Sequence, residues 1–296
     1  MADRRRAVPE NVPGDWFVDS TCIDCGICRW VAPATFGDAE ETAFVWAQPG
    51  DVEAAARAAV ACPVGSIGGP AEHVRVATRA FPHPVVPNVS FCGWANRDSY
   101  GAMAWLIQRP SGNVLVDVPR ATPALMDRVE AMGGVRWMVL THRDDVAGHE
   151  KWAERFGAER VLHRAELSAD TRTIEHPVDG PTWLDDDLEL IGLYGHTRGS
   201  MGLLWRDILF SGDHVWGAGP RGWHAEGADP VVAHPLGAGR SVCWWSWPEQ
   251  IRSMESLLER RFVHILPGHG RPWHGGEAAR EPALRALLAR MSARTP

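Results

Sequence analysis

The chain has 296 residues, of which 45% are hydrophobic and 23% are charged, a composition typical of a globular protein with a buried core. Its formal net charge of −7 gives no electrostatic basis for binding nucleic acid, and no apolar run is long enough to span a membrane. We therefore expect neither nucleic acid nor membrane as a partner. The charged stretch Met1–Glu10 is not followed by an apolar segment, so we expect no secretory signal and a cytoplasmic protein.

Four of the six cysteines share a spacing typical of metal clusters. Two residues separate Cys22 from Cys25 and Cys25 from Cys28, and Cys62 is followed directly by Pro63. A cubane iron–sulfur cluster needs four converging thiolates, and the short steps let a loop wrap one side while a distant cysteine closes the other. Four cysteines can also hold a structural zinc ion. The third cysteine at the same spacing and the Cys-Pro ending favour the cluster.

This segment resembles the single-cluster bacterial ferredoxins over roughly Asp19–Ile67. The resemblance implies one 4Fe-4S cluster on the four cysteines. We expect a ferredoxin-like domain over residues 16–75, after a flexible N-terminus at residues 1–15. The proline-rich stretch Gly69–Pro87 has no apolar periodicity and is predicted to be a linker. A short, stiff linker would dock the ferredoxin part in one orientation, with Trp30 near the interface.

The remaining chain, residues 76–296, mixes strand patterns with helix patterns. We expect two strands within residues 101–119 and further strands at residues 135–142, 160–163, 188–193, 202–206, 207–213 and 263–270. Helices are expected at residues 123–134, 145–157 and 248–262 and from Glu277 onward. This mixture suggests two sheets covered by helices, so the predicted fold class is α+β.

Histidines and aspartates recur at the ends of these predicted strands. They are Asp117, His142, His196, Asp213 and His269. Strand ends that face one edge of a sheet form a shared cleft, where side chains can converge. Histidine and carboxylate together suit zinc, iron or manganese, so the sequence predicts a metal site at that edge.

The segments GHTRGS, SGD and LPGHG around His196, Asp213 and His269 resemble motifs of the metallo-β-lactamase superfamily. The resemblance covers roughly Val85 to the C-terminus and implies an αββα sandwich with the metal site at the sheet edge. It also implies that these three residues are metal ligands and that Asp117 is a structural or orienting acid. The domain is expected over residues 76–296.

The stretch LTHRDDVAGH departs from the superfamily's main motif, T-H-x-H-x-D-H. Aligned from the helix that follows, Asp144 takes the place of the motif's aspartate and Asp145 that of its third histidine, and one histidine is missing. His149 is a possible substitute ligand, or a histidine packed on the core face of the helix. The alternative is a broken first metal position, in which an aspartate merely caps the helix.

We expect retained binding of one or two divalent ions, iron, zinc or manganese. Asp144 and Asp145 are the candidate catalytic residues, and in a zinc hydrolase one of them would take the proton of the metal-bound water. The expected metal ligands are His142, Asp144, Asp145, His196, Asp213 and His269. This set is rich in carboxylates, and hard oxygen ligands shift the preference toward iron or manganese.

The long segment from Val215 to Trp247 follows Asp213 and should lie over this site. Its possible substrate-lid residues are Trp216, Trp223, Arg240, Trp244 and Trp245. The alternative is that these tryptophans only pack the loop against its own domain.

A cluster beside a metal site favours a redox enzyme that acts on a small molecule and exchanges electrons with a redox partner protein. A zinc hydrolase of an ester, thioester or lactone is the second hypothesis, since a metal-bound hydroxide needs no cluster. The third is a non-catalytic electron carrier with a degenerate metal site.

Overall fold

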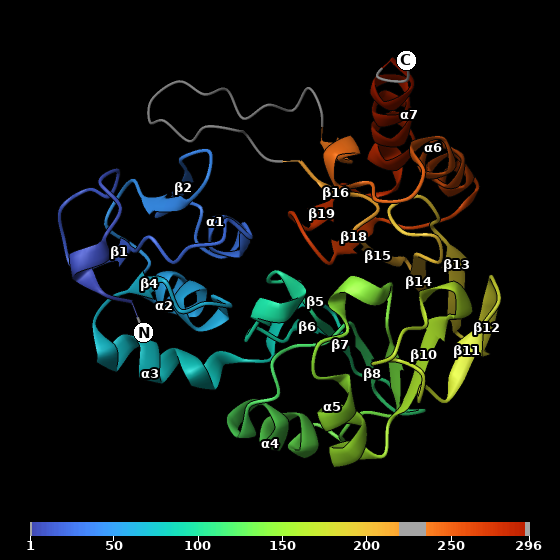
Figure 1. Cartoon of the computed structure of the whole chain (residues 1–296), viewed down its shortest axis with the longest axis horizontal. Coiled ribbons are helices and arrows are strands. Elements are labelled where there is room, and N and C mark those ends of the chain that lie inside the picture. The colour runs from blue at the N-terminus through green and yellow to red at the C-terminus, as the bar shows by residue number, and fades with distance from the viewer. Residues whose placement is uncertain (1, 219–234, 294–296) are drawn as a thin grey trace.

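The computed structural model describes residues 2–218 and 235–293, and it places a small N-terminal unit beside a larger sandwich (Figure 1). The N-terminal unit contains β1 Phe17–Val18, α1 Ile27–Val31, β2 Phe36–Asp38, β3 Ala43–Val45, α2 Val52–Ala61 and β4 Ile67–Gly68. Its strands form two antiparallel pairs, β1 with β4 and β2 with β3. Asp51 caps α2 by accepting a hydrogen bond from the Ala54 N–H, and the alanine-rich face of α2 packs on α1.

Residues 2–15 are attached to this unit, whereas the sequence predicted a flexible N-terminus. A short 3-10 turn, Arg4–Arg6, begins the segment. The Val8 N–H donates to the Val18 carbonyl at 2.9 Å, and the Val12 N–H donates to the Val45 carbonyl at 2.8 Å. Val8 is also buried. A few apolar residues between the charges therefore anchor a segment whose charged composition suggested mobility.

The predicted linker over Gly69–Pro87 is instead regular structure. It forms helix α3 Ala71–Ala77, a 3-10 turn at Thr78–Ala80 and strand β5 His83–Val86. Two of its prolines are compatible with these elements because each occupies a place where an N–H is not needed. Pro70 precedes the first turn of α3, and Pro84 lies in β5, which is an edge strand of the larger sheet.

Two sheets form the sandwich. The first sheet runs in the order β11-β10-β9-β8-β7-β6-β5, and its other strands are β6 Val89–Phe91, β7 Trp105–Ile107, β8 Val114–Val116, β9 Trp137–Val139, β10 Glu159–His163 and β11 His176–Val178. The second runs in the order β12-β13-β14-β15-β18-β19, with β12 Thr182–Asp185, β13 Leu188–Gly192, β14 Met201–Trp205, β15 Ile208–Gly212, β18 His264–Pro267 and β19 Trp273–His274. A small extra pair consists of β16 Trp216–Gly217 and β17 Leu236–Gly237.

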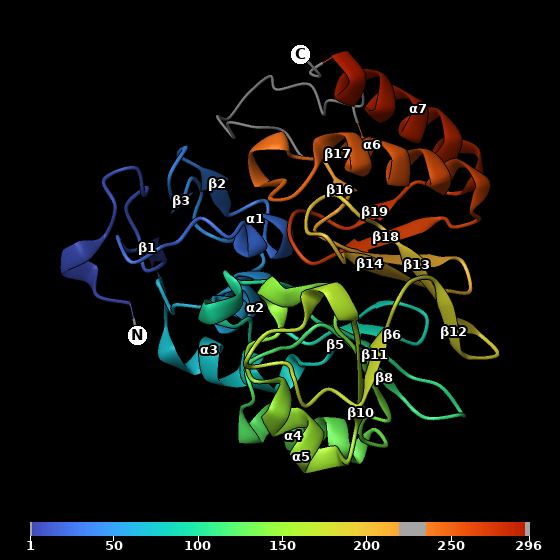
Figure 2. The same cartoon turned by 45° about the vertical axis from the view of Figure 1, so that its right-hand side comes forward.

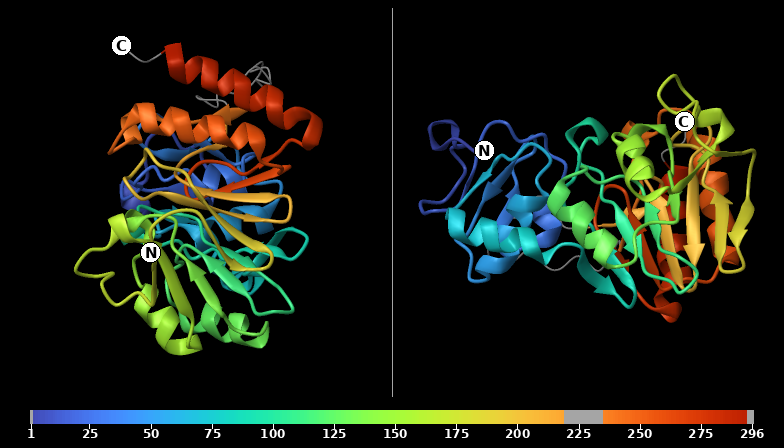
Figure 3. Two further views of the ribbon diagram at one scale, coloured as in Figure 1. Left: turned by 90° about the vertical axis from the view of Figure 1, so that its right-hand side faces the viewer. Right: turned by 90° about the horizontal axis from the view of Figure 1, so that it is seen from below.

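Helices cover the outer faces of the two sheets, which gives the predicted αββα order of layers (Figure 2). Helices α4 Pro123–Ala131 and α5 His149–Phe156 lie on the first sheet, and α6 Trp247–Ser256 and α7 Glu277–Ala293 lie on the second (Figure 3, left). Among the described residues, no helix is long and apolar enough to cross a lipid bilayer.

The N-terminal unit packs directly against the sandwich through aromatic side chains. The Trp30 ring lies 5.0 Å from that of Phe91 and 5.8 Å from that of Trp105, both in edge-on geometry. Phe91 and Trp105 belong to β6 and β7 of the first sheet and are fully buried. The prediction that Trp30 lies at the interface is therefore confirmed, and the unit sits beside one end of the sandwich (Figure 3, right).

Candidate functional site

The four spaced cysteines converge on one pocket in the N-terminal unit. Cys22, Cys25 and Cys28 come from the loop before and within α1, and Cys62 follows the last turn of α2. The rest of the lining is mostly apolar, with Ile23, Ile27, Ala43, Val64 and Ile67 among its members. Gly26 precedes α1 with φ +82°, a left-handed conformation that lets the loop turn sharply between the second and third cysteines.

Backbone N–H groups point at two of these sulfurs. The Cys22 Sγ accepts hydrogen bonds from the Asp24 and Ala43 N–H groups, both at 3.4 Å, and the Cys62 Sγ accepts one from the Ser66 N–H at 3.4 Å. Such bonds favour thiolate sulfur and tune the potential of an iron–sulfur cluster. Burial has the opposite effect on the free thiols, since it raises the pKa of Cys25 to about 12. Cys25 therefore ionises only with a strong positive partner, which is what a cluster supplies.

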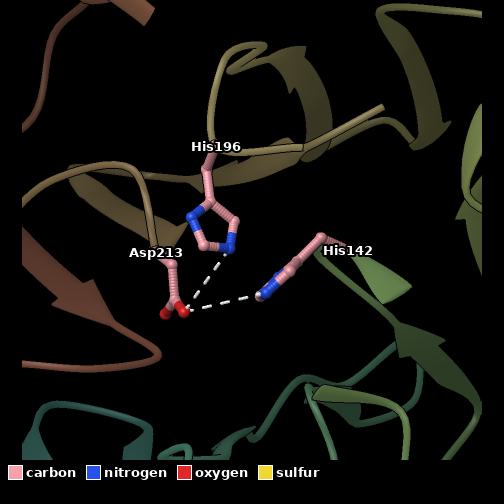
Figure 4. A group of neighbouring side chains, drawn as sticks. All are labelled: His142, His196 and Asp213. Atoms are coloured by element: carbon pink, nitrogen blue, oxygen red, sulfur yellow. Dashed lines mark ion pairs between the residues drawn. The ribbon is translucent and has the colours of Figure 1, made fainter. Parts of the chain in front are cut away.

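A second group of side chains converges at the edge of the sandwich, where several strands end. His142 follows β9, His196 lies between β13 and β14, and Asp213 follows β15. Figure 4 shows the three side chains pointing toward one another. Asp213 Oδ2 lies 3.7 Å from His142 Nε2 and 3.8 Å from His196 Nε2. Asp144 completes this group, with Oδ2 at 3.7 Å from His142 Nε2 and 3.5 Å from His196 Nε2.

Asp213 also belongs to a neighbouring group with Asp145 and His269. The His269 Nδ1 lies 2.9 Å from both Asp213 carboxylate oxygens and 3.9 Å from Asp145 Oδ2. Each group offers three or more ligand atoms within reach of a single ion. Because Asp213 faces both groups, the arrangement can hold two ions that share one carboxylate.

The side-chain atoms at this centre are buried and lack partners within the described part of the chain. These atoms are His142 Nε2, His196 Nε2, His269 Nε2 and Asp145 Oδ2. A buried polar atom without a partner is costly, and four such atoms on the residues of this centre fit a metal ion. Burial lowers the pKa of His142 to about 4, so this imidazole is neutral at pH 7, as a metal ligand must be.

Neighbouring groups fix the orientation of both histidines in the first group. The His196 Nδ1–H donates to the Val242 carbonyl at 2.5 Å, which leaves Nε2 free to bind. Buried Asp117 accepts hydrogen bonds from the Thr141 N–H at 2.8 Å and hydroxyl at 3.0 Å, and that hydroxyl lies 3.0 Å from His142 Nδ1. Asp117 thus takes the orienting position that the superfamily resemblance implied.

A further positioning residue, Glu166, was not found from the sequence. Its side chain is fully buried, and it accepts a hydrogen bond from the Gly199 N–H at 2.6 Å and another from the Arg143 N–H at 3.2 Å. One carboxylate therefore ties the loop of His196 to the turn that carries His142, Asp144 and Asp145. The only sequence signal was an acidic residue just after the predicted strand at residues 160–163, where nothing marked it as buried.

Comparisons with known proteins find relatives of both the N-terminal unit and the sandwich. Residues 18–69 match the family described as the 4Fe-4S single cluster domain of Ferredoxin I. Two solved structures of DIM-1 metallo-β-lactamase resemble the fold. One has a TM-score of 0.50 and 18% identity, and covers 70% of this chain and 95% of that one. The other, exposed to ceftazidime, has a TM-score of 0.51 and 17% identity, and covers 72% and 96%.

The chain joins a single-cluster 4Fe-4S ferredoxin domain to a metallo-β-lactamase fold. Two curated relatives match part of it. The uncharacterized protein YmaE of Bacillus subtilis (strain 168) is 29% identical over 133 residues, which is 42% of this chain and 48% of that protein. A hydroxyacylglutathione hydrolase of Acidiphilium cryptum (strain JF-5) is 32% identical over 123 residues, 39% of this chain and 50% of that protein. The chain thus spans about half the length of these relatives.

The structure adds detail for Asp144 and His149 in the metallo-β-lactamase-fold domain. Asp144 lies beside His142 and His196, and counted from His142 it stands at the position of the motif's second histidine. His149 is not in either group. Helix α5 begins at His149, and its imidazole contacts Arg160 Nη1 at 3.0 Å and the Asp170 carbonyl at 3.3 Å. In the structure His149 is therefore a packed histidine and lies outside the ligand groups.

The predicted lid residues differ in whether they line the cleft. Trp216 and Trp244 line the cleft over the metal ligands, and the Trp244 ring lies 6.2 Å from that of His196. Trp245 and Arg240 are exposed and are not among the residues that line it. Trp223 lies outside the described residues.

The same cleft reaches the ferredoxin domain. It measures about 1130 Å³, and its lining includes Cys25 and Arg29 on one side and Asp144, His196, Asp213 and His269 on the other. A cysteine of the cluster pocket and the candidate metal ligands therefore face one shared space.

Proposed function

We propose that the protein is a redox metalloenzyme, in which the cluster exchanges electrons with a metal centre that acts on a small molecule. The observation that carries this proposal is the shared cleft, lined by Cys25 from the cluster pocket and by Asp144, His196, Asp213 and His269 from the metal centre. A hydrolase does not need a cluster beside its metal ion, because a metal-bound hydroxide attacks the substrate without a change of oxidation state.

In this proposal the two sets of residues divide the work. Cys22, Cys25, Cys28 and Cys62 hold the cluster, which supplies one electron at a time when bound. The two histidine and aspartate groups hold one or two ions. Their carboxylate content favours iron or manganese, and these metals change oxidation state where zinc does not.

The protein side chains around the cleft bind the substrate and limit water. Tyr100, Trp216 and Trp244 give aromatic walls beside the metal ligands, and such surfaces bind the apolar part of a small molecule. Burial of His142 and His196 keeps their imidazoles oriented toward the centre. A one-electron donor protein would reduce the cluster between turnovers.

A hydrolase is the second candidate, and the partial similarity to a hydroxyacylglutathione hydrolase supports it. In that case zinc occupies the centre, the substrate is an ester, thioester or lactone, and the cluster has a structural or sensing role.

The test is anaerobic purification with iron, zinc and sulfide measured per chain, followed by chemical reduction. We expect acid-labile sulfide, iron in excess of the cluster, and a change in the spectrum of the second centre when the cluster is reduced. Cys25→Ser should abolish that change and retain the second-site metal. Cys92→Ala is the matched control, since Cys92 is fully buried next to β6 and does not line the cluster pocket.

The contrary result is full esterase, thioesterase or lactonase activity from a folded, cluster-free Cys25→Ser protein with zinc at the second centre. That outcome would assign the protein to the hydrolases. A wild type that holds only cluster iron after reconstitution would instead favour the electron carrier.

A further inference from the structure

A short turn of the sandwich domain touches the cluster pocket at Cys25. Gly101 has φ +85°, and a Cβ added to it would lie 2.7 Å from Cys25 Cβ and 3.0 Å from Cys25 Sγ. The same Cβ would lie 3.0 Å from Pro63 Cγ, next to Cys62. Glycine is required here both by its backbone conformation and by this close approach. The main chain at Gly101 therefore packs against the edge of the pocket that Cys25 forms.

Tyr100, the residue before Gly101, lies beside the metal centre. The Tyr100 ring lies 6.2 Å from the His269 imidazole, tilted by 46°. Tyr100 also has a positive φ of 49°, unusual for a residue other than glycine. Two consecutive residues in left-handed conformations thus place one main chain against Cys25 and one aromatic ring beside His269. Strained backbone of this kind is retained when its surroundings hold it in place.

Hydrogen bonds fix this turn to the loops that carry the metal ligands. The Asn96 amide donates to the Ala147 carbonyl at 3.0 Å, and the Gly101 N–H donates to the Asn96 carbonyl at 2.8 Å. After the turn, the Met103 N–H donates to the Gly268 carbonyl at 2.7 Å, one residue from His269. The turn is therefore held at a fixed distance from the metal centre, as an electron route requires.

From this geometry we infer that Tyr100 and Gly101 form the electron route between the cluster and the metal centre, entering at Cys25 and leaving at His269. The inference rests on the proposed redox function. One electron, delivered to the cluster by a low-potential one-electron donor, passes along this route to a ferric ion, which becomes ferrous as the cluster returns to its oxidised state. No bond is made or broken, and no proton moves in the step. The route works because protein atoms, the Gly101 main chain against Cys25 and the Tyr100 ring beside His269, couple donor and acceptor better than the open space of the cleft does.

The experiment measures one electron transfer without substrate. The whole protein carries its cluster and ferric iron at the second centre, a photoreduced flavin delivers one electron, and the reoxidation of the cluster is followed by absorbance. Wild type with zinc at the second centre gives the baseline, because zinc accepts no electron. Metal content and the cluster potential are measured for every variant.

We expect Tyr100→Leu to slow reoxidation by at least about tenfold, since a gap replaces the ring. Gly101→Ala should slow it as well, because its Cβ pushes the turn away from Cys25. Tyr100→Phe should keep the wild-type rate, since the ring and not the hydroxyl makes the contact. Trp183→Leu is the matched control and should also keep it. Trp183 is 60% exposed, as Tyr100 is at 59%, but it lies on the edge strand β12 and lines neither the cluster pocket nor the cleft.

Wild-type rates in both Tyr100→Leu and Gly101→Ala, with iron retained, would overturn the route and leave the redox function standing. A ferric wild type that reoxidises no faster than the zinc baseline would overturn the redox function and the route together.

Discussion

The cluster pocket and the metal centre collect their ligands in different ways. The pocket takes four cysteines from one small domain, three of them from a single loop. The metal centre takes six side chains from four separate loops, which come together only when both sheets of the sandwich have formed. The first site is therefore a local structure, and the second depends on the whole sandwich fold.

The two sites also differ in how they balance the cost of burial. In the pocket burial raises the pKa of the Cys25 and Cys28 thiols, and few charges oppose it, so these two ligands depend on the cluster for their ionised form. In the metal centre the effect of burial on a histidine pKa is opposed by the charge of a neighbouring carboxylate. Burial opposes the shift of His269, but the neighbouring Asp213 carboxylate raises the pKa of this imidazole to about 10. An internal ion pair can therefore support the metal centre before any ion binds.

The largest effect is expected from Asp213→Asn, because Asp213 faces both ligand groups. We expect the affinity for both ions to fall by more than about 100-fold, at or beyond the upper range for loss of an outer-shell partner. Both affinities are measured by calorimetry during titration with metal, on protein with an intact cluster. The cluster should be unaffected because its pocket shares no ligand with the centre.

Asp144→Asn is the comparison for that variant. Asp144 lies only with His142 and His196, so we expect one ion to weaken and the other to remain. Equal losses of both ions in the two variants would contradict a centre made of two groups joined by Asp213.

The difference between the sites also explains what the sequence could predict. The four cysteines follow a local spacing, so the cluster pocket could be recognised from the sequence. The histidines and aspartates at strand ends were also recognisable, because strand ends converge in a sandwich. Asp144 and His149 were harder to place, since a turn of the chain, Arg143–Asp145, decides which neighbour each side chain faces. Glu166 carried only a weak signal, its place after a predicted strand, because its role depends on tertiary burial.

Glu166→Gln should have a smaller effect than Asp213→Asn. The amide keeps one acceptor oxygen but loses the other, so either the Gly199 or the Arg143 N–H is left without its partner. We expect metal affinity to fall by about tenfold, the lower range for a positioning group, with the cluster unchanged. Glu159→Gln is the matched control, since Glu159 is half exposed and pairs with His176 at the sheet surface. Equal affinities in the two variants would remove Glu166 from the positioning role.

The smallest effect is expected from Glu175→Gln, which tests the structural interpretation of His149. Glu175 accepts hydrogen bonds from the Arg160 N–H and guanidinium, and Arg160 in turn contacts His149. The hydrogen bonds from Arg160 lower the pKa of Glu175 from its ordinary 4.5 to about 2. The folded protein thus favours the carboxylate, so the pair stabilises the fold above pH 4.5. That contribution is lost as the pH falls through the pKa of about 2.

Because the Glu175 side chain is 41% exposed, we expect the variant to lose only roughly 0.5–1 kcal/mol of unfolding free energy at pH 7, as partly exposed ion pairs do. Urea unfolding of wild type and variant at matched pH should show the difference shrinking as the pH falls below 4.5, and any loss of the cluster in acid is common to both. Metal content at pH 7 should stay at the wild-type level, because Arg160 and Asp170 hold His149 outside the ligand groups. A loss of second-site metal in Glu175→Gln would instead return His149 to the metal centre.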